Sequence, residues 1–523
     1  YKRQGCGQSR ALIFGSELKA LKAWPGFEGR VCRTALDQYL RFMYIPAPRT
    51  IYQNVFKLEP GCMITVPDLP LSNVPPHLIL PGQEHCGVAV RRWWSLADSV
   101  RTNGKAPITN EAEALTLLER TLSESVSLQS LADVPLGAFL SGGVDSSTIV
   151  ALMQLKSSRP VKTFTIGFEE VGFDESTHAL AVARHLGTEH HEIRLNAQMA
   201  LDIIPSLPQI YDEPFADPSQ IPTHLVSRAA RQRVTVALSG DAGDELFGGY
   251  NRYFWGPRLW NKVSWMPFSV RRGVGSLVHL APYQLWDTLC RLVGVNRLGE
   301  KVHKLADRLL RVESQRDLHW SLVTEWTCDE QLVVGNSEIC TNIATAQLPI
   351  WCEVQGQTWE ASGLTVVEQM MLLDSLTYLP DDILCKVDRA AMACSLETRV
   401  PFLDHRVVEL AWRLPMHMKI RGNQSKWALR QVLYKYVPKE LIERPKTGFG
   451  IPVGIWLRGP LREWAEELLN PKRLADQGYL NPKPITRVWH EHLSGRRDHT
   501  SKLWAVLMFQ SWLDHQAAPL ATS

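Results

Sequence analysis

The stretch SGGVDSS at residues 141–147 decides the fold, because it joins an apolar run to a helix-like apolar pattern. The run before it, 134–140, predicts a strand, and residues 146–155 predict a helix. A glycine-rich turn between strand and helix presents backbone amides at a helix N-terminus, where anions bind. Gly142 and Gly143 let a phosphate approach the backbone closely. The stretch therefore predicts a phosphate-binding loop.

The side chains of this loop suit a nucleotide phosphate and its metal ion. Ser141, Ser146 and Ser147 supply hydroxyl donors, and Asp145 can hold a magnesium ion. It is not a Walker loop, because the lysine of GxxxxGK[ST] is missing. An ordinary turn of small residues is the structural alternative, and seven matching positions between a strand and a helix argue against it.

Strand-like and helix-like patterns alternate around this loop. Strands are predicted at 162–168, 191–195 and 234–238, and helices at 175–186, 197–206 and 221–232. This alternation predicts a doubly wound parallel sheet, in which ligands bind beyond the carboxyl ends of the strands. A second loop, SGDAGDELFGGY at 239–250, follows the last of these strands. Its Asp244 could bind one magnesium ion together with Asp145, and an exposed acidic turn is the alternative.

Two further blocks carry charged residues. Buried charge is costly unless it is paired or used, so LPDDILCKVDRAAMACSLETRVPFLD at 379–404 predicts a site or a buried ionic network. Its charged residues include Asp381, Asp382, Lys386, Asp388, Arg389, Glu397 and Arg399, and for Arg399 a structural role is an equal alternative. Lys446, in the loop RPKTGFG, can meet phosphate charge as pyrophosphate departs. Lys426, in QSKWALR, is a second basic candidate, with a lysine on a helix surface as the alternative.

The composition is that of an ordinary globular protein of more than one domain. The chain has 523 residues, with 45% hydrophobic and 21% charged residues. A net charge of +3 gives no reason to expect nucleic acid, and the ten cysteines show no zinc spacing. No apolar run is long enough to span a bilayer. We expect a cytoplasmic protein with small-molecule partners and no membrane contact, and we allow for a homodimer.

Together these blocks resemble the asparagine synthetase (glutamine-hydrolysing) family over nearly the whole chain. SGGVDSS, FTIGF at 164–168, FDES at 173–176, SGDAGDELFGGY, the block 379–404 and RPKTGFG occur in the family's order. GSELKAL at 15–21 and YIPAPRTIYQNVFKLEPG at 44–61 are similar to the end of the family's N-terminal glutaminase domain. The family's catalytic N-terminal cysteine has no counterpart here, because Tyr1 falls far inside that domain and Cys6 does not match the motif.

The resemblance implies two domains. Residues 1–95 are expected to be the remnant of an N-terminal nucleophile glutaminase domain with a linker, truncated at its start. Residues 110–523 are expected to form an asparagine synthetase domain. Its fold would be an α/β doubly wound parallel sheet of the ATP pyrophosphatase (adenine nucleotide alpha hydrolase-like) type, with a largely helical C-terminal part.

The resemblance also implies the chemistry. ATP adenylates aspartate to β-aspartyl-AMP with release of pyrophosphate, and ammonia, taken from glutamine in the full-length enzyme, displaces AMP. ATP and Mg²⁺ are the expected cofactors, with Asp145 and Asp244 as metal ligands. The implied catalytic residues are Asp241, Lys446 and Glu397. The implied ATP-binding residues are Leu140, Ser141, Gly142, Gly143, Asp145, Ser146, Ser147, Ile166, Ser239 and Gly240. The implied substrate-binding residues are Asp382, Lys386, Arg389 and Arg399.

Other interpretations use the same architecture. β-Lactam synthetases, lasso-peptide cyclases and relatives from polysaccharide or exosortase gene clusters adenylate other carboxylates. GMP and NAD synthetases share the first loop but lack the SLETRVPFLD block. A non-enzymatic relative would have lost part of the phosphate machinery, whereas Asp145, Asp244 and Lys446 are all present.

Overall fold

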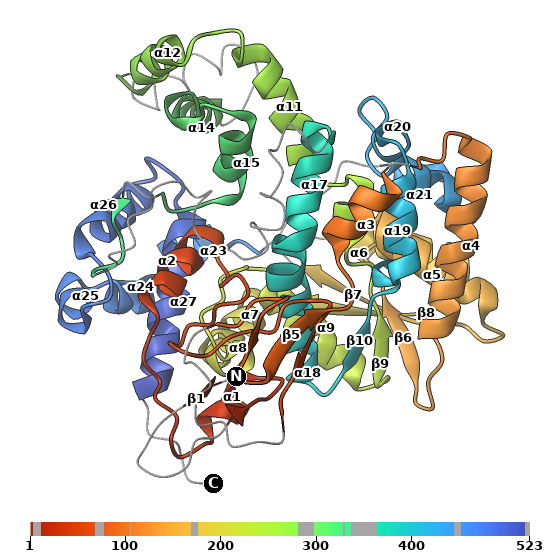
Figure 1. Cartoon of the computed structure of the whole chain (residues 1–523), viewed down its shortest axis with the longest axis horizontal. Coiled ribbons are helices and arrows are strands. Elements are labelled where there is room, and N and C mark those ends of the chain that lie inside the picture. Colours follow the sequence, from red (N-terminus) through yellow and green to blue (C-terminus); the bar gives the residue numbers. More distant parts are fainter. Residues whose placement is uncertain are drawn as a thin grey trace.

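A five-stranded parallel sheet organises the molecule (Figure 1). The computed structural model describes residues 2–3, 12–67, 78–104, 106–168, 176–280, 298–327, 330–335, 363–443 and 451–517. The strands in these ranges are β1 (Lys2–Arg3), β2 (Leu12–Ile13), β3 (Cys62–Thr65), β4 (Glu84–His85), β5 (Val88–Arg92), β6 (Leu136–Phe139), β7 (Lys162–Phe168), β8 (Glu189–Leu195), β9 (Val236–Leu238) and β10 (Glu397–Arg399).

Helices make up most of the rest of the described chain. Those in the first half are α1 (Leu18–Lys22), α2 (Arg33–Phe42), α3 (Leu96–Asn103), α4 (Glu111–Gln129), α5 (Val144–Lys156), α6 (Ser176–Leu186), α7 (Ala197–Ile203), η1 (Ile204–Ser206), α8 (Leu207–Tyr211), α9 (Gln220–Arg231), α10 (Gly243–Phe247) and α11 (Arg252–Val263). Those that follow are α12 (Phe268–Leu280), α14 (Leu298–Arg311), α15 (Gln315–Val323), α17 (Val366–Leu376), η4 (Leu379–Leu384), α18 (Cys385–Met392), η5 (Pro401–Leu403), α19 (His405–Arg413), α20 (Met416–Lys419), α21 (Trp427–Leu433), α22 (Lys439–Ile442), α23 (Val453–Arg458), α24 (Arg462–Leu468), α25 (Pro471–Gln477), α26 (Pro482–Leu493) and α27 (Thr500–Ala517).

The sheet has the strand order β10-β9-β6-β7-β8, and every pairing in it is parallel. From β6 the chain runs outward through β7 to β8, and then returns to place β9 on the other side of β6. The strand order therefore reverses between β6 and β9. The loops that leave these two neighbouring strands meet at this switch point, which is where open α/β sheets bind ligands. The predicted parallel sheet is confirmed.

Hydrophobic cores lie on both faces of the sheet. Ala138 and Leu140 pack into a core that includes α4, α5, α19 and α21. Phe164 packs into a separate core with α8, α9 and α27. Apolar side chains thus point alternately to the two faces, as expected for strands covered on both sides.

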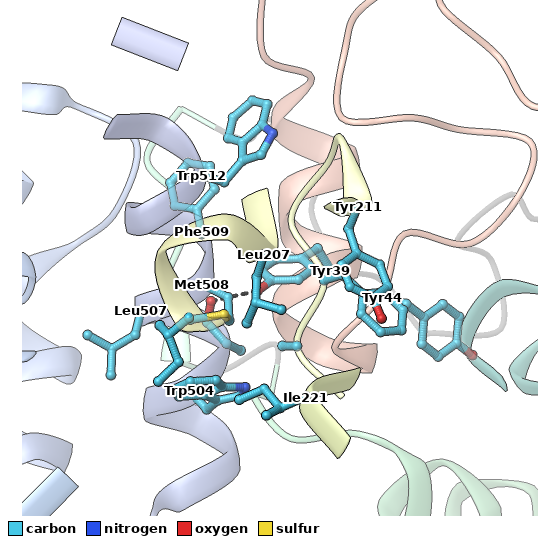
Figure 2. Close-up of a cluster of buried hydrophobic side chains, with 14 of the residues drawn as sticks. Tyr39, Tyr44, Leu207, Tyr211, Ile221, Trp504, Leu507, Met508, Phe509 and Trp512 are labelled. Atoms are coloured by element: carbon cyan, nitrogen blue, oxygen red, sulfur yellow. Dashed lines mark hydrogen bonds between the residues drawn. The ribbon is translucent and has the colours of Figure 1, made fainter. Parts of the chain in front are cut away.

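The N-terminal residues share the second of these cores. Figure 2 shows Tyr39 of α2 among side chains of α8 and α27. The hydroxyl of Tyr39 donates a hydrogen bond to the backbone oxygen of Ala505 at 2.7 Å. The indole of Trp512 donates to the backbone oxygen of Asp212 at 2.8 Å. The N-terminal segment and the C-terminal helix therefore close one core together.

Some predicted elements differ from the structure. The apolar and aromatic residues at 51–58 predict a further strand, but only isolated bridges such as Val31–Tyr52 form there. The helix predicted at 197–206 divides into α7 and η1, and α8 follows directly. Pro205 and Pro208 explain the division, because neither can donate the backbone hydrogen bond that a continuous helix needs. Among the helices of the described ranges, none has both the length and the apolar character needed to cross a membrane.

Candidate active site

The loop after β6 has the backbone of an anion site. α5 begins at Val144, and Gly142 has a φ of +73°. A Cβ at Gly142 would lie 2.9 Å from the backbone nitrogen of Ala179, so only glycine fits there. The hydroxyls of Ser141 and Ser146 lie 3.0 Å apart on this loop. Ser147 is fully buried behind it.

The loop after β9 packs directly on the first loop. A Cβ at Gly240 would lie 2.7 Å from the backbone nitrogen of Ser146. A Cβ at Gly243 would overlap the carboxylate of Asp145. These two glycines therefore allow the loops to touch. Two segments almost a hundred residues apart in sequence form one continuous surface at the switch point.

Lys426 joins the acidic residues of both loops. Its ammonium forms an ion pair with Asp145 and another, at 2.6 Å, with Asp244. Burial alone would lower the pKa of Lys426, but the two carboxylates raise it above its usual value. A Cβ at Gly249 would overlap both Asp244 and Lys426, so this glycine makes room for the pair.

The interpretation of Lys426 as a lysine on a helix surface is wrong. The residue is 5% exposed and stands with a φ of +54° just before α21. Nothing in QSKWALR itself signals burial. The sequence offered only an indirect signal. Two carboxylates predicted at the phosphate site need a cation nearby to compensate their charge.

The pair Asp145 and Asp244 fits a magnesium ion. Two carboxylates from different loops converge on one cationic group, and hard oxygen donors are the ligands that Mg²⁺ prefers. Within the described ranges, no group of three or more His, Cys, Asp or Glu residues could hold a metal ion. Phosphate oxygens and water would therefore complete the coordination, as is usual for Mg²⁺ with a nucleotide.

A buried ionic cluster lies beside these loops. The ammonium of Lys386 donates to Asp217 at 2.7 Å and to the hydroxyl of Ser219 at 2.8 Å. Burial, together with the charge of Asp217, raises the pKa of Asp382 well above its usual range. Burial also raises the pKa of Asp241, against the hydrogen bond from Ser239 and the charge of Lys386. One lysine thus faces three carboxyl groups.

Asp217 also belongs to this cluster, although it was not predicted from the sequence. The side chain of Asp217 is only 16% exposed. The signal available was the segment DEPFADPSQ, in which an aspartate stands among apolar and proline residues. Asp382 and Lys386, which the sequence analysis proposed as substrate-binding residues, lie in the cluster with Asp217.

The remaining residues of the 379–404 block lie apart from these loops. Glu397 is exposed and pairs with Val236, the first residue of β9, so it stands at the amino end of the sheet. Because the ligand edge is the carboxyl end, we exclude Glu397 from the proposed site, although it was expected to be catalytic.

Arg399 and Arg389 serve contacts elsewhere in the fold. The guanidinium of Arg399 donates to the backbone oxygens of Gln129 and Leu131, at 2.9 and 2.7 Å, which is the structural alternative weighed for it. Arg389 pairs with Glu17 at 3.3 Å and therefore ties down the N-terminal segment. We exclude both from the substrate pocket.

Other predicted residues have simple placements. Leu140 and Ile166 are buried, the first just after β6 and the second within β7. Lys446 falls in 444–450, outside the described residues.

Behind the second loop, Glu245 is fully buried and accepts a hydrogen bond from the hydroxyl of Tyr250 at 2.6 Å. Burial raises the pKa of Glu245 to about 8, and the charge of Asp244 adds to the effect.

Comparison with known proteins places this geometry in a family. The family model for asparagine synthase matches residues 117–514, and the model for the glutamine amidotransferase domain matches residues 5–73. A putative asparagine synthetase [glutamine-hydrolyzing] of Mycobacterium tuberculosis is 33% identical over 502 residues, covering 94% of this chain and 70% of the relative. Asparagine synthetase [glutamine-hydrolyzing] 1 of Bacillus subtilis is 29% identical over 503 residues, covering 96% and 71%. Amidase chyE of Penicillium rubens is 22% identical over 505 residues, covering 90% and 69%. With the motif loops of both strands at one switch point and a family match over most of its length, the chain belongs to the asparagine synthase family.

Proposed function

We propose that this chain uses ATP to activate the side-chain carboxylate of aspartate and transfers nitrogen to it, forming asparagine, AMP and pyrophosphate. The observation that carries the proposal is the meeting of Asp145, Asp244 and Lys426 where the loops after β6 and β9 touch. Members of this family use ATP, and two relatives are named as glutamine-hydrolysing asparagine synthetases, which supports asparagine as the product and hence aspartate as the acceptor.

The loop 141–147 is proposed to hold the phosphate chain. Backbone amides at the start of α5 and the hydroxyls of Ser141 and Ser146 donate hydrogen bonds to phosphate oxygens. Leu140, Ile166, Ser239 and Gly240 are proposed to line the adenosine pocket. Asp145 and Asp244 would hold Mg²⁺, which neutralises phosphate charge when bound.

Lys426 is proposed as a phosphate-binding residue. Its ammonium already lies between the two carboxylates that face the phosphate chain, so a small movement brings it onto a phosphate oxygen. Fixed positive charge there stabilises the negative charge that develops on departing pyrophosphate. We propose Lys446 as a second such group.

The cluster of Asp241, Asp382, Asp217 and Lys386 is proposed as the acceptor pocket. One aspartate carboxylate oxygen attacks the α-phosphorus, and pyrophosphate leaves. Ammonia then attacks the carbonyl carbon of the acyl-adenylate, the C–O bond to AMP breaks, and a proton goes to solvent. The pocket contributes by holding two anions close together in the reacting orientation.

The test measures pyrophosphate and AMP release with ATP, magnesium and aspartate, with ammonium and with glutamine as alternative nitrogen donors. We expect pyrophosphate release that requires aspartate, and AMP release that requires both aspartate and a nitrogen source. ATP binding without aspartate-dependent pyrophosphate release would reject aspartate as the acceptor. A panel of other carboxylates would then identify the acceptor.

Asp145→Asn tests the proposed metal site within the same assay. Losing one carboxylate charge beside the phosphates should lower pyrophosphate release by about a hundredfold or more, with the fold retained. It should also raise the magnesium concentration needed for ATP binding. Asp133→Asn, at an exposed position, is the matched control. If Asp145→Asn released pyrophosphate as fast as the wild type, the loop 141–147 would have no role in the mechanism.

A further inference from the structure

Two segments of the chain form walls of the proposed acceptor pocket. The first wall, residues 211–220, carries Asp217. The second wall, residues 379–386, carries Asp382 and Lys386. Lys386 joins the two walls, because its ammonium pairs with Asp217 at 2.7 Å. The shape of the pocket therefore depends on how the two walls are held relative to each other.

A third segment, residues 43–57, holds both walls. It lies in the part of the chain that matches the glutamine amidotransferase model. The backbone nitrogen of Ala216, in the first wall, donates to the backbone oxygen of Met43 at 2.9 Å. The backbone nitrogen of Ala47 donates to the carboxylate of Asp381, in the second wall, at 3.0 Å. One N-terminal segment thus contacts the two walls at separate points.

Each wall carries two acidic residues with different partners. In the first wall, Glu213 contacts the N-terminal segment, whereas Asp217 pairs with Lys386. In the second wall, Asp381 is bound by the N-terminal segment, whereas the charge of its neighbour Asp382 acts on Lys386. We call Glu213 and Asp381 the outer pair. Because each outer residue shares a short segment with a pocket residue, the contacts of the outer pair fix where the pocket residues lie.

Lys57 provides positive charge to the outer pair. Its ammonium pairs with Glu213 at 2.7 Å and donates to the backbone oxygen of Ile45 at 2.6 Å. The other carboxylate oxygen of Glu213 accepts a hydrogen bond from the backbone nitrogen of Ile51 at 3.1 Å. Burial raises the pKa of Asp381 to about 6, and the charge of Lys57 opposes this rise. Burial alone would lower the pKa of Lys57, but the carboxylates of the outer pair raise it.

We propose that Lys57 is a positioning residue for the carboxylate acceptor, because it holds the two walls at the spacing that the pocket needs. The proposal rests on the proposed function, in which Asp217, Asp382 and Lys386 belong to the acceptor pocket. The contacts of Lys57 lie on the first wall and within the N-terminal segment. Its loss should therefore disturb the acceptor more than the nucleotide.

The alternative is an ion pair that only stabilises the fold. Such a pair would change the stability of the protein without favouring either substrate. A positioning residue instead acts on one substrate. Loss of binding for that substrate alone raises its KM while kcat changes little.

The experiment measures pyrophosphate release by the whole chain at saturating ammonium, while the concentration of aspartate or of ATP is varied. Lys57→Met should raise the KM for aspartate by about tenfold, because small displacements of positioning groups are costly. The KM for ATP should stay within about twofold of the wild-type value. Lys57→Arg keeps the positive charge and a donor for Glu213, so it should recover most of the lost affinity.

Arg33→Met is the matched control. Arg33 also belongs to the N-terminal part of the chain, and its guanidinium donates to the backbone oxygen of Gly478 at 2.9 Å, away from both walls. We expect this variant to keep the wild-type KM for aspartate.

A double variant tests whether Lys57 acts through Glu213. Glu213→Gln can still accept the hydrogen bond from Ile51 but loses the ion pair, so it should raise the KM for aspartate as Lys57→Met does. The two substitutions together should be no worse than either alone, because both remove the same interaction. Effects that add would show that Lys57 does not act through the first wall. If Lys57→Met fails to fold, Glu213→Gln decides the outcome.

The results separate this proposal from the proposed function. If Lys57→Met has the same KM for aspartate as Arg33→Met, or raises the KM for ATP equally, Lys57 is only structural and the proposal is overturned. If the wild type itself shows no aspartate-dependent release, the acceptor is wrong, and the same comparison is made with the carboxylate that the panel identifies. Absence of release with every carboxylate overturns both.

Discussion

Lys426 compensates the charge of two carboxylates that belong to different loops. Removing one member of a buried ionic set is costly, about 3–5 kcal/mol in typical cases, because it leaves uncompensated charge behind. Lys426→Met should therefore lower stability in chemical denaturation and also lower pyrophosphate release by about a hundredfold. Lys426→Arg should restore stability better than activity, because a planar guanidinium replaces a compact ammonium.

Lys435→Met is the control for this prediction, because Lys435 forms an ion pair with Glu119 at 2.6 Å on the surface of the protein. Surface ion pairs contribute little to stability. If Lys426→Met were as active as Lys435→Met, Lys426 would have no role at the phosphates.

Glu245 makes the stability of the protein depend on pH. Burial raises its folded-state pKa to about 8, from an ordinary value of 4.5. Between these two values the folded protein binds the proton more strongly than the unfolded chain does. The free energy of unfolding should therefore fall as pH rises from about 4.5 to about 8, by at most about 1.4 kcal/mol per pH unit from this group.

Glu245→Gln should remove this contribution while still accepting a hydrogen bond from Tyr250. Urea denaturation at a series of pH values measures it. The variant should show a shallower decline of stability toward alkaline pH than the wild type. Parallel pH profiles for the two proteins would show that Glu245 does not titrate in this range.

At the scale of elements, the contact between the loops after β6 and β9 rests on glycine. Gly240→Ala would bring a Cβ to 2.7 Å from a backbone nitrogen of α5, and a backbone atom cannot move away cheaply. We expect the loops to separate, with pyrophosphate release reduced more than stability. Gly273→Ala, in a helix with open space around it, is the control and should be neutral or slightly stabilising. Full activity of Gly240→Ala would mean that the loops need not touch.

The parallel sheet and its two loops were predictable from sequence because their signals are local. Glycine-rich turns, apolar strands and the alternation with helices all lie within short windows. Asp217 was not predictable in this way, and neither was the burial of Lys426, which QSKWALR had offered as a basic candidate. Both depend on an ion pair with a distant segment. Glu397 shows the converse case, in which the local sequence suggests a site residue that the fold places elsewhere. Its block forms part of the buried cluster, but the direction of β10 puts Glu397 at the wrong end of the sheet.

At the scale of the whole molecule, α2 and α27 bury their apolar faces against each other and against α8. Tyr39→Ala should therefore destabilise the entire protein, by about 3–5 kcal/mol for a buried aromatic side chain. The unfolding midpoint measured from total helix content and the midpoint measured from loss of ATP binding should shift by the same amount. Trp24→Ala, at a half-exposed position, is the control. A variant that loses N-terminal structure but keeps the nucleotide site stable would contradict this prediction.

The shared core also bears on how relatives could exchange their parts. The boundary between the two family matches falls between residues 73 and 117, but the hydrogen bond from Tyr39 to Ala505 crosses it. A chimera joined at that boundary would pair α2 from one parent with α27 from the other, and mismatched side chains would meet in the interior. We therefore expect successful recombination between relatives to exchange α2 and α27 together. The part of the chain that must be inherited as one piece is then larger than the part that carries out the chemistry.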